Sequence, residues 1–147
     1  MIGRLLRKCD FERVLAVTPC SRSPHFAVHY LQAGPSAPAK PARLVAAEKL
    51  CTGDSQDGAV SVDNSPCGHW LGTVIPKRHA ARSVTRNTLR RQVRAAVQRH
   101  ESSLRPGLWL VRLRQPFAKA GYPAADSTAM RRAAAVELDR LLARAGQ

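Results

Sequence analysis

Hydrophobic side chains recur along the chain with two different spacings, and their order predicts a mixed fold. Apolar residues three and four positions apart indicate helices, whereas alternation with polar residues indicates strands. The patterns predict a helix over residues 4–17, strands over 25–31 and 70–75, a helix over 83–100, a strand over 108–114 and a helix from Asp126 or Ser127 to about Ala145. The order α-β-β-α-β-α predicts an α+β class, a small sandwich of helices packed on one sheet.

The same spacings predict which face of each element is buried. In the first strand Phe26, Val28 and Tyr30 share the side expected to face the core, so His29 faces the other way. In the helix over residues 83–100, one apolar stripe consists of Leu89, Val93, Ala96 and Val97. The opposite side, centred roughly 120° away, carries Asn87, Arg90, Arg91 and Arg94. Ser83 or Thr85 is placed to cap this helix.

Residues 33–68 break the pattern of regular elements. Pro, Gly, Ser and Asp are frequent there, and only residues 43–50 have enough apolar content for a short strand or helical turn. A connection of this length is unusual inside a compact domain. We therefore expect a flexible insertion between two strands of one sheet, within a single domain of residues 1–147.

Charge and cysteine content narrow the class of protein. The chain has 147 residues, a net charge of +14 and a pI near 11.2. Such a surface repels itself unless a polyanion neutralises it, which favours a nucleic acid partner. No apolar run approaches the about 20 residues needed to span a bilayer, and the N-terminal segment lacks the core of a secretory signal. The four cysteines form no CxxC pair, so we expect free thiols in a reducing cytoplasm.

The positive charge is densest from Pro76 to His100, and no carboxylate occurs from Asn64 to His100. Arginine dominates this stretch, which suits bidentate contacts to phosphate. A basic run can be only a solvated face, but its concentration on one side of a helix favours a nucleic acid surface. The candidate RNA-binding residues are Lys77, Arg78, Arg82, Arg86, Asn87, Arg90, Arg91 and Arg94.

No arrangement of residues indicates that the protein itself is a nuclease. Two-metal hydrolysis needs clustered carboxylates, whereas the ten acids here are scattered along the chain. The five histidines have no nucleophile–base motif around them. A zinc site built from Cys67, His69 and two distant cysteines would lack the close ligand pairs of tetrahedral sites. We therefore expect no catalytic residue and no metal ligand in the chain.

The stretch from Lys77 to Arg94 resembles the signature of the bacterial ribonuclease P protein component. In that family a strand leads into a basic pair, a short loop and then Arg-Asn-x-x-(Lys/Arg)-Arg-x-x-Arg on a helix. Here the pair is Lys77-Arg78, and the helical motif is Arg86, Asn87, Arg90, Arg91 and Arg94. The motif matches at every position, and the resemblance covers roughly residues 4–32 and 69–144.

The resemblance implies a small α/β sandwich with a left-handed βαβ crossover, against the usual right-handed rule. It implies a cytoplasmic protein subunit that binds a large catalytic RNA through the arginine helix and the 5′ leader of precursor tRNA in a cleft formed by the sheet and that helix. The RNA would cleave the phosphodiester bond with Mg²⁺ held mainly by the RNA. The protein, inactive alone, would raise substrate affinity and help to recruit metal ions; we infer no membrane and no protein partner.

Two departures and two alternatives stay open. The family cleft commonly carries aromatic side chains that stack on leader bases, at the positions of Phe11, Leu15 and His29, and only Phe11 is a full aromatic here. The insertion is the second departure. One alternative is a DNA-binding regulator that lays residues 86–99 in a major groove, although residues 70–82 are predicted as strand and loop. The other is a structural RNA-binding protein of the ribosomal type.

Overall fold

The computed structural model describes residues 1–36, 68–117 and 127–147. All six predicted elements are present in the predicted order, together with two short strands and a 3₁₀ turn that the sequence patterns missed. The elements are β1 (Ile2–Arg4), α1 (Lys8–Ala16), β2 (Ser21–Arg22), β3 (Phe26–Leu31), β4 (His69–Val74), α2 (Ser83–His100), η1 (Glu101–Ser103), β5 (Gly107–Leu113) and α3 (Thr128–Ala145). Among the described helices, none has the length and hydrophobicity of a membrane span.

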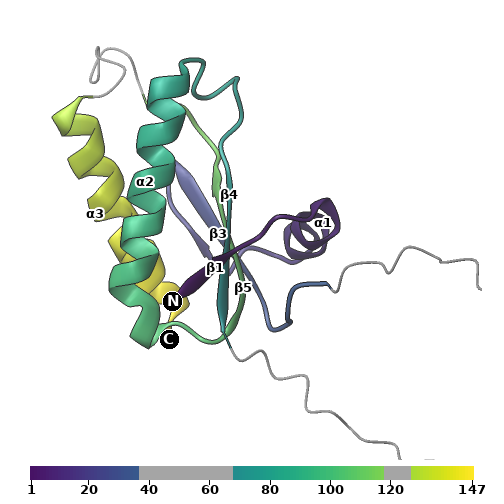
Figure 1. Cartoon of the computed structure of the whole chain (residues 1–147). Helices are drawn as coiled ribbons and strands as arrows, with labels where there is room; N and C mark the ends of the chain where they lie inside the picture. Colours follow the sequence, from purple (N-terminus) through teal and green to yellow (C-terminus); the bar gives the residue numbers. More distant parts are fainter. Residues whose placement is uncertain (37–67, 118–126) are drawn as a thin grey trace, which may run out of the picture.

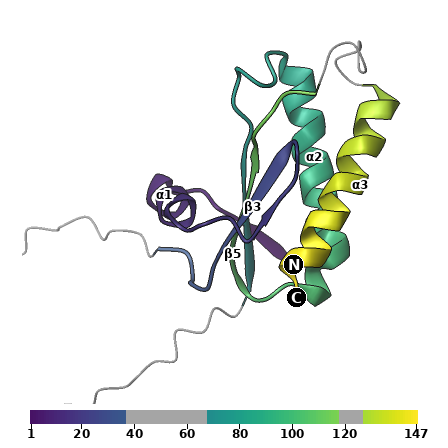
Figure 2. The ribbon, with the colours of Figure 1, turned by 180° about the vertical axis from the view of Figure 1, so that it is seen from behind.

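The strands form one five-stranded sheet in the order β1-β4-β5-β3-β2. β1, β4 and β5 are parallel, whereas β3 is antiparallel to both of its neighbours. Seen from α2 with β4 and β5 running upward, the chain passes from β4 on the right through α2 to β5 on the left (Figures 1 and 2). The β4–α2–β5 crossover is therefore left-handed, as the resemblance implied.

Two hydrophobic clusters lie on opposite faces of the sheet. α2 and α3 lie side by side over one face, where Phe26, Val28 and Trp109 are buried in the larger cluster (Figures 1 and 2). α1 covers the other face, where Val14 and Leu110 belong to a smaller cluster. The predicted phase of β3 is confirmed, because Phe26 and Val28 face the helix pair.

The beginning of the chain differs from the helix predicted over residues 4–17. Ile2–Arg4 instead forms β1, the N–H of Leu5 donates to Leu71 O at 3.1 Å, and α1 starts only at Lys8. Three residues are too few to show the alternation of a strand. β2 was missed for the same reason, since it has only two residues.

The two long helices begin in different ways. The N-cap of α2 is Arg82, without a side-chain hydrogen bond, so the expected cap from Ser83 or Thr85 is wrong: the helix already includes both residues. The start of α3 agrees with one of the two predicted caps, because Ser127 Oγ accepts from the N–H of Met130 at 3.1 Å.

The first four residues of the expected insertion, 33–36, lie in the described part of the chain. Ala33 packs against the smaller cluster, and the N–H of Ser36 donates to the buried carboxylate of Asp10 at 3.0 Å. Residues 33–36 therefore belong to the folded body, and the rest of the predicted insertion to residue 67 lies outside the described residues. Cys9 and Cys20 are free thiols, while Cys51 and Cys67 also fall outside the described ranges.

Candidate nucleic-acid interface

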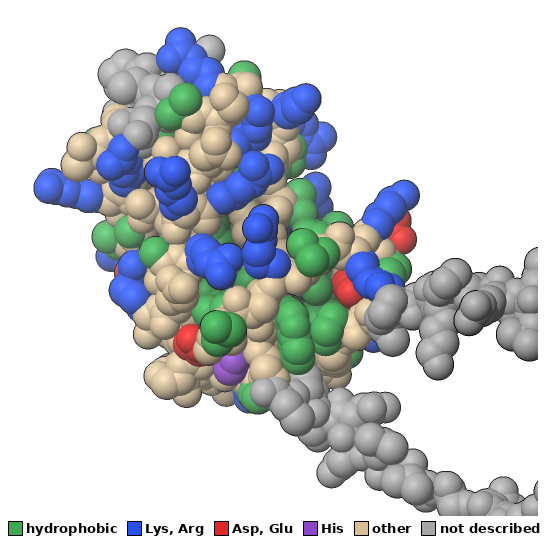
Figure 3. Space-filling view, in the orientation of Figure 1, with side chains coloured by type: hydrophobic (Ala, Val, Ile, Leu, Met, Phe, Trp, Pro, Cys, Tyr) green, Lys and Arg blue, Asp and Glu red, His purple; other side chains and the backbone are tan. Residues whose placement is uncertain are grey.

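The basic face of α2 exists because its apolar stripe is buried. Leu89 and Val93 pack in the larger cluster, so the opposite side of the helix faces solvent. As predicted, that side exposes Asn87, Arg90, Arg91 and Arg94. Figure 3 shows Lys and Arg side chains gathered over α2 and the loop before it. α2 contains no Asp or Glu, so no carboxylate of its own offsets this charge.

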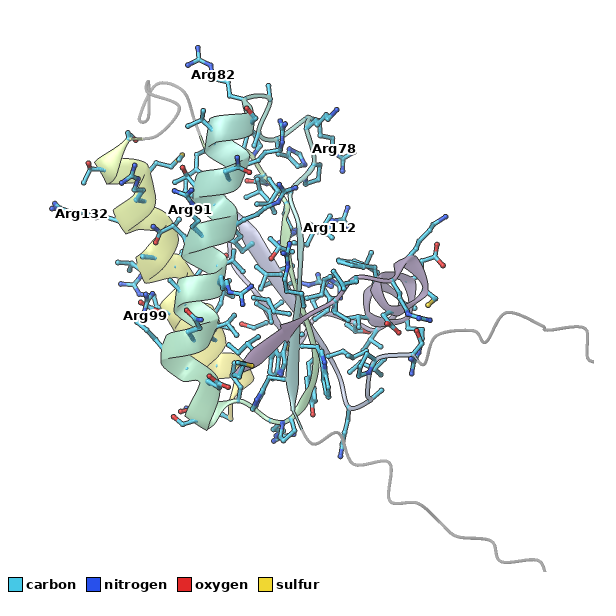
Figure 4. The ribbon with its side chains drawn as sticks, viewed as in Figure 1. Arg78, Arg82, Arg91, Arg99, Arg112 and Arg132 are labelled. Atoms are coloured by element: carbon cyan, nitrogen blue, oxygen red, sulfur yellow. The ribbon has the colours of Figure 1, made fainter. Side chains whose placement is uncertain are left out.

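The loop between β4 and α2 adds three exposed cations, Lys77, Arg78 and Arg82. Its first turn is closed by Pro76 O, which accepts from the N–H of His79 at 3.0 Å and of Ala80 at 3.1 Å. Figure 4 shows Arg78 and Arg82 extending from this end of the molecule. The predicted basic pair and the arginine helix therefore form one continuous positive surface.

Arg86 behaves differently from the other arginines of the motif. Its side chain is only partly exposed, and Nη1 donates to Ala80 O at 2.9 Å and to Ala81 O at 2.7 Å. The guanidinium group therefore holds the end of the basic loop against the first turns of α2. Arg86 is in the predicted site, but the structure gives it a positioning contact within the protein.

The three predicted leader residues lie on the α1 face, not beside the arginine helix. Phe11 and Leu15 project from α1 and pack, partly buried, against the smaller cluster. α2 covers the opposite face of the sheet, so the expectation that sheet and arginine helix together enclose these residues is wrong. Gly72 makes the close approach of α1 feasible, because a Cβ there would lie 2.8 Å from the Phe11 ring.

His29 faces α1 as strand alternation predicted, but it is only 5% exposed. Its Nδ1–H donates to the carbonyl of Val17 at 2.8 Å, just beyond the end of α1. The ring is therefore held in one orientation and is not free to swing outward. The alternation of the strand correctly predicted which face of the sheet His29 occupies. It did not predict that His29 is buried, because the residues that cover it, at the end of α1, lie elsewhere in the chain.

Beside His29 the α1 face is hollowed, with a volume of about 390 Å³. The lining residues are Pro19, Arg22, Ala27, His29, Arg112 and Arg114. The three arginines were missed among the predicted site residues. For Arg112 a signal was present, because it follows Leu108 and Leu110 at alternate positions and must share their face. Figure 4 shows Arg112 on the α1 side of the sheet, away from Arg91 and Arg99.

All five carboxylates that the structure describes are engaged by other groups of the protein. Asp10 accepts from Arg13 and Ser36, Glu12 pairs with Lys8, Glu101 with the N-terminal ammonium, Glu137 with Ser23 and His25, and Asp139 with Arg99 and His100. No group of three or more His, Cys, Asp or Glu side chains in this part of the chain could hold a metal. This donor set does not fit Mg²⁺, which prefers free carboxylate oxygens and water.

The family model for ribonuclease P matches residues 3–142, which include β4, the basic loop, the arginine helix and most of α3. The chain belongs to the ribonuclease P family. Its membership agrees with the signature that runs from Lys77 to Arg94.

Individual relatives of this ribonuclease P family protein cover it to different extents. The ribonuclease P protein component of Bordetella parapertussis is 40% identical over 77 residues, 52% of this chain and 58% of the relative. That of Burkholderia mallei is 38% identical over 77 residues, 52% of this chain and 57% of the relative. The matched part thus spans little more than half the length of these curated relatives.

Solved structures give the same fold at lower identity. A structure of the RNase P protein from Staphylococcus aureus aligns with a TM-score of 0.55 and 20% identity, covering 98% of this chain and 89% of the other. A second structure of that protein aligns with a TM-score of 0.52 and 17% identity, covering 95% and 92%. These alignments confirm the predicted α+β sandwich.

Proposed function

We propose that this chain is the protein subunit of ribonuclease P, a ribonucleoprotein endoribonuclease that removes the 5′ leader from precursor tRNA. The observation that carries the proposal is the complete Arg-Asn-Arg signature on the outward side of α2, in a chain of this family. Guanidinium groups that point to solvent suit the phosphates of a folded RNA. The two bacterial relatives described above are ribonuclease P protein components.

In this proposal the protein binds and the RNA subunit performs the hydrolysis. Mg²⁺ is held mainly by the RNA, which supplies the phosphate oxygens that the ion prefers. The engagement of Asp10, Glu137 and Asp139 by protein groups supports this division, because each carboxylate already has its partner. The catalytic chemistry therefore needs no side chain of this protein.

In this proposal the two faces of the sheet bind two different RNAs. The catalytic RNA lies against the positive surface formed by Lys77, Arg78, Arg82, Asn87, Arg90, Arg91 and Arg94, with Arg86 holding the loop. The single-stranded leader lies on the α1 face, where Phe11 keeps part of its ring accessible and Leu15 and His29 line the same side. The cytoplasm is the proposed location, because both RNA partners are found there.

The geometry favours this function over a DNA-binding regulator. A helix-turn-helix protein presents its recognition helix after another helix, whereas α2 follows β4 and a loop. A ribosomal-type RNA-binding protein would share the basic surface, so the two RNA-binding functions are separated by experiment.

The test is reconstitution of the full chain with a bacterial catalytic RNA at low Mg²⁺, with precursor tRNA as substrate. We expect 5′ leader removal to be faster with the protein than without it, and rigorously RNA-free protein to show no cleavage at any Mg²⁺ concentration. Binding of the RNA without any gain in cleavage would favour a structural RNA-binding protein. Cleavage by RNA-free protein would contradict the assignment of the chemistry to the RNA.

A further inference from the structure

We propose that the outward side of the helix pair α2 and α3 binds double-stranded RNA, with Arg91 of α2 and Arg132 of α3 holding phosphates on either side of the line where the helices meet. The inference rests on the proposed function for the source of the duplex, which is a base-paired region of the catalytic RNA. It adds α3 to the RNA-binding surface, whereas the sequence signature lies wholly in the basic loop and α2.

The neighbouring arginines Arg90 and Arg91 point in different directions from α2. The side of α2 that faces α3 is marked by Arg99, because its Nη2 donates to Asp139 Oδ1 of α3 at 2.9 Å. At 100° per residue Arg90 lies about 180° around the helix from Arg99, whereas Arg91 lies only about 80° from it. Arg91 therefore stands on the half of the outward face that lies next to α3.

On α3, Arg132 stands beside Arg91. The two helices run side by side in the same direction (Figures 1 and 2), and the bond between Arg99 and Asp139 fixes their relative height. Arg91 precedes Arg99 by eight residues and Arg132 precedes Asp139 by seven, so their backbones differ by only about 1.5 Å along the helices. Around α3, Arg132 lies about 20° from Asp139 and therefore on the side nearest α2. Figure 4 shows Arg91 and Arg132 at similar heights on the two helices, with Arg99 below them.

The positive charge of this surface is not neutralised by the helices themselves. α2 contains no Asp or Glu, and both carboxylates of α3 are engaged elsewhere, Asp139 at the end of α2 and Glu137 at the turn before β3. Arg91 and Arg132 are exposed, and neither makes a hydrogen bond or ion pair within the described residues. Like charges held close together repel, and an anion between them removes that repulsion.

The side chains of the two helices suit a duplex and not a single strand. Neither α2 nor α3 contains an aromatic residue, whereas proteins that bind single strands stack the bases on aromatic rings. Double-stranded RNA is recognised by its shape, through its phosphates and 2′-hydroxyl groups. Ala95 and Ala135, each four residues before the bond between Arg99 and Asp139, are small and half-buried. No bulky side chain at that level therefore keeps an RNA backbone away from the helices.

The decisive measurement is binding of a short, fully paired RNA duplex to the purified full chain, beside a single-stranded oligouridylate. Arg132→Gln is expected to weaken duplex binding about fivefold and to lower its salt slope by about 0.7–0.9, without affecting the oligouridylate. The matched control is Arg144→Gln, since Arg144 is an exposed arginine of the same helix, about 120° around it and about 18 Å along it from Arg132. This control should change duplex affinity less than about twofold.

A second pair of variants changes the charge of the surface without removing an arginine. Val136 lies one turn after Arg132 and is 50% exposed. In Val136→Glu the new carboxylate pairs with Arg132 four residues away and repels phosphate. Duplex binding should therefore weaken about as much as in Arg132→Gln. Val136→Gln introduces a side chain of nearly the same shape without the charge and should bind like the wild type. Melting curves establish that each variant is folded.

Three outcomes would overturn the inference. Equal losses for Arg132→Gln and Arg144→Gln would mean that only net charge matters. An equal loss of oligouridylate binding would show that the surface does not select a duplex, and unchanged duplex binding in Arg132→Gln would remove α3 from the RNA-binding surface. The proposed function is tested separately: if the wild type fails to stimulate precursor tRNA cleavage while duplex binding still depends on Arg132, the function fails and the duplex-binding surface stands.

Discussion

At the scale of single residues, the arginines of one motif divide into two kinds. At 100° per residue Arg86 lies about 60° from Leu89 around α2, whereas Arg91 lies about 160° away. Arg86 therefore borders the buried stripe and donates to Ala80 O and Ala81 O, while Arg91 points to solvent. The motif alone treats these arginines as equivalent.

The first prediction separates positioning from RNA contact. Arg86→Gln is expected to lower both RNA affinity and the free energy of unfolding, the latter by about 1–2 kcal/mol, because the loop loses its hydrogen bonds. Urea denaturation measures the loss, and faster amide exchange of His79 and Ala80 would report a loosened loop. The matched control changes Arg90 and Arg91 to Gln: it should leave unfolding unchanged and reduce the salt slope of RNA binding by about 0.7–0.9 per lost contact. Identical behaviour of the two variants would contradict this division.

The alternation of side chains along a strand predicts which face each residue occupies, but it does not predict how deeply the residue is buried. Alternation correctly placed His29 opposite Phe26 and Val28, because the side chains of a strand project alternately to its two faces. It gave neither the burial of His29 nor its bond to Val17 O, since both depend on where α1 ends. The alternation of β5 alone could have placed Arg112 on the α1 face of the sheet. Arg22 could not have been placed in this way, because β2 has only two residues.

At the scale of elements, one carboxylate fastens α3 to the turn between β2 and β3. Glu137 of α3 accepts from Ser23 Oγ and, at 2.8 Å, from the backbone N–H of His25, and it lies 2.8 Å from His25 Nδ1. The His25 ring also stacks on Phe117 at 4.2 Å. This anchor ties α3 to the turn that joins β2 to β3. No local pattern could predict a contact between residues 112 positions apart.

The second prediction concerns the pH dependence of this anchor. Burial acts to raise the pKa of Glu137, but hydrogen bonds from Ser23 and from the N–H and ring of His25 outweigh it and hold that pKa below its ordinary value. Ionised Glu137 therefore stabilises the fold above about pH 4.3, and this contribution is lost as pH falls through the lower folded-state pKa.

Glu137→Gln should accordingly lower stability by about 1–3 kcal/mol at neutral pH, several degrees in melting temperature. The gap between variant and wild type should narrow as pH falls below about 4. Thermal melts between neutral pH and pH 3 measure it, with Glu12→Gln as a control in an exposed carboxylate. A gap that stays constant with pH would show that the charge of Glu137 does not stabilise the anchor.

At the scale of the whole molecule, sequence patterns predicted the class and order of the long elements but not how they join. Each long helix and strand carries its own period, so its existence follows from local spacing. The parallel pairing of β4 with β5 and the left-handed crossover depend on contacts between distant segments. General rules favour the opposite hand, and only the resemblance carried by Arg86, Asn87 and their neighbours gave the correct one.

The final prediction concerns the connection between β3 and β4. Residues 37–67 join Ser36, which is hydrogen-bonded to Asp10 of α1, to Gly68, whose carbonyl accepts from the N–H of Gly107. A Gly/Ser linker long enough to join these two points leaves both hydrogen bonds in place. Replacing residues 37–67 with a short Gly/Ser linker should therefore leave the free energy of unfolding within about 1 kcal/mol of the original, since loop closure changes by only about 0.6 kcal/mol per doubling of length.

The matched variant extends the same replacement back to residue 33. It removes the packing of Ala33 and the N–H of Ser36 that satisfies the buried Asp10, and should cost a further 1–3 kcal/mol, about the penalty for an unpaired buried acceptor. Urea denaturation of both variants and their stimulation of precursor tRNA cleavage give the comparison. If the shorter replacement already costs as much as the longer one, residues 37–67 contribute packing of their own, and the insertion is part of the domain that stabilises the α1 face.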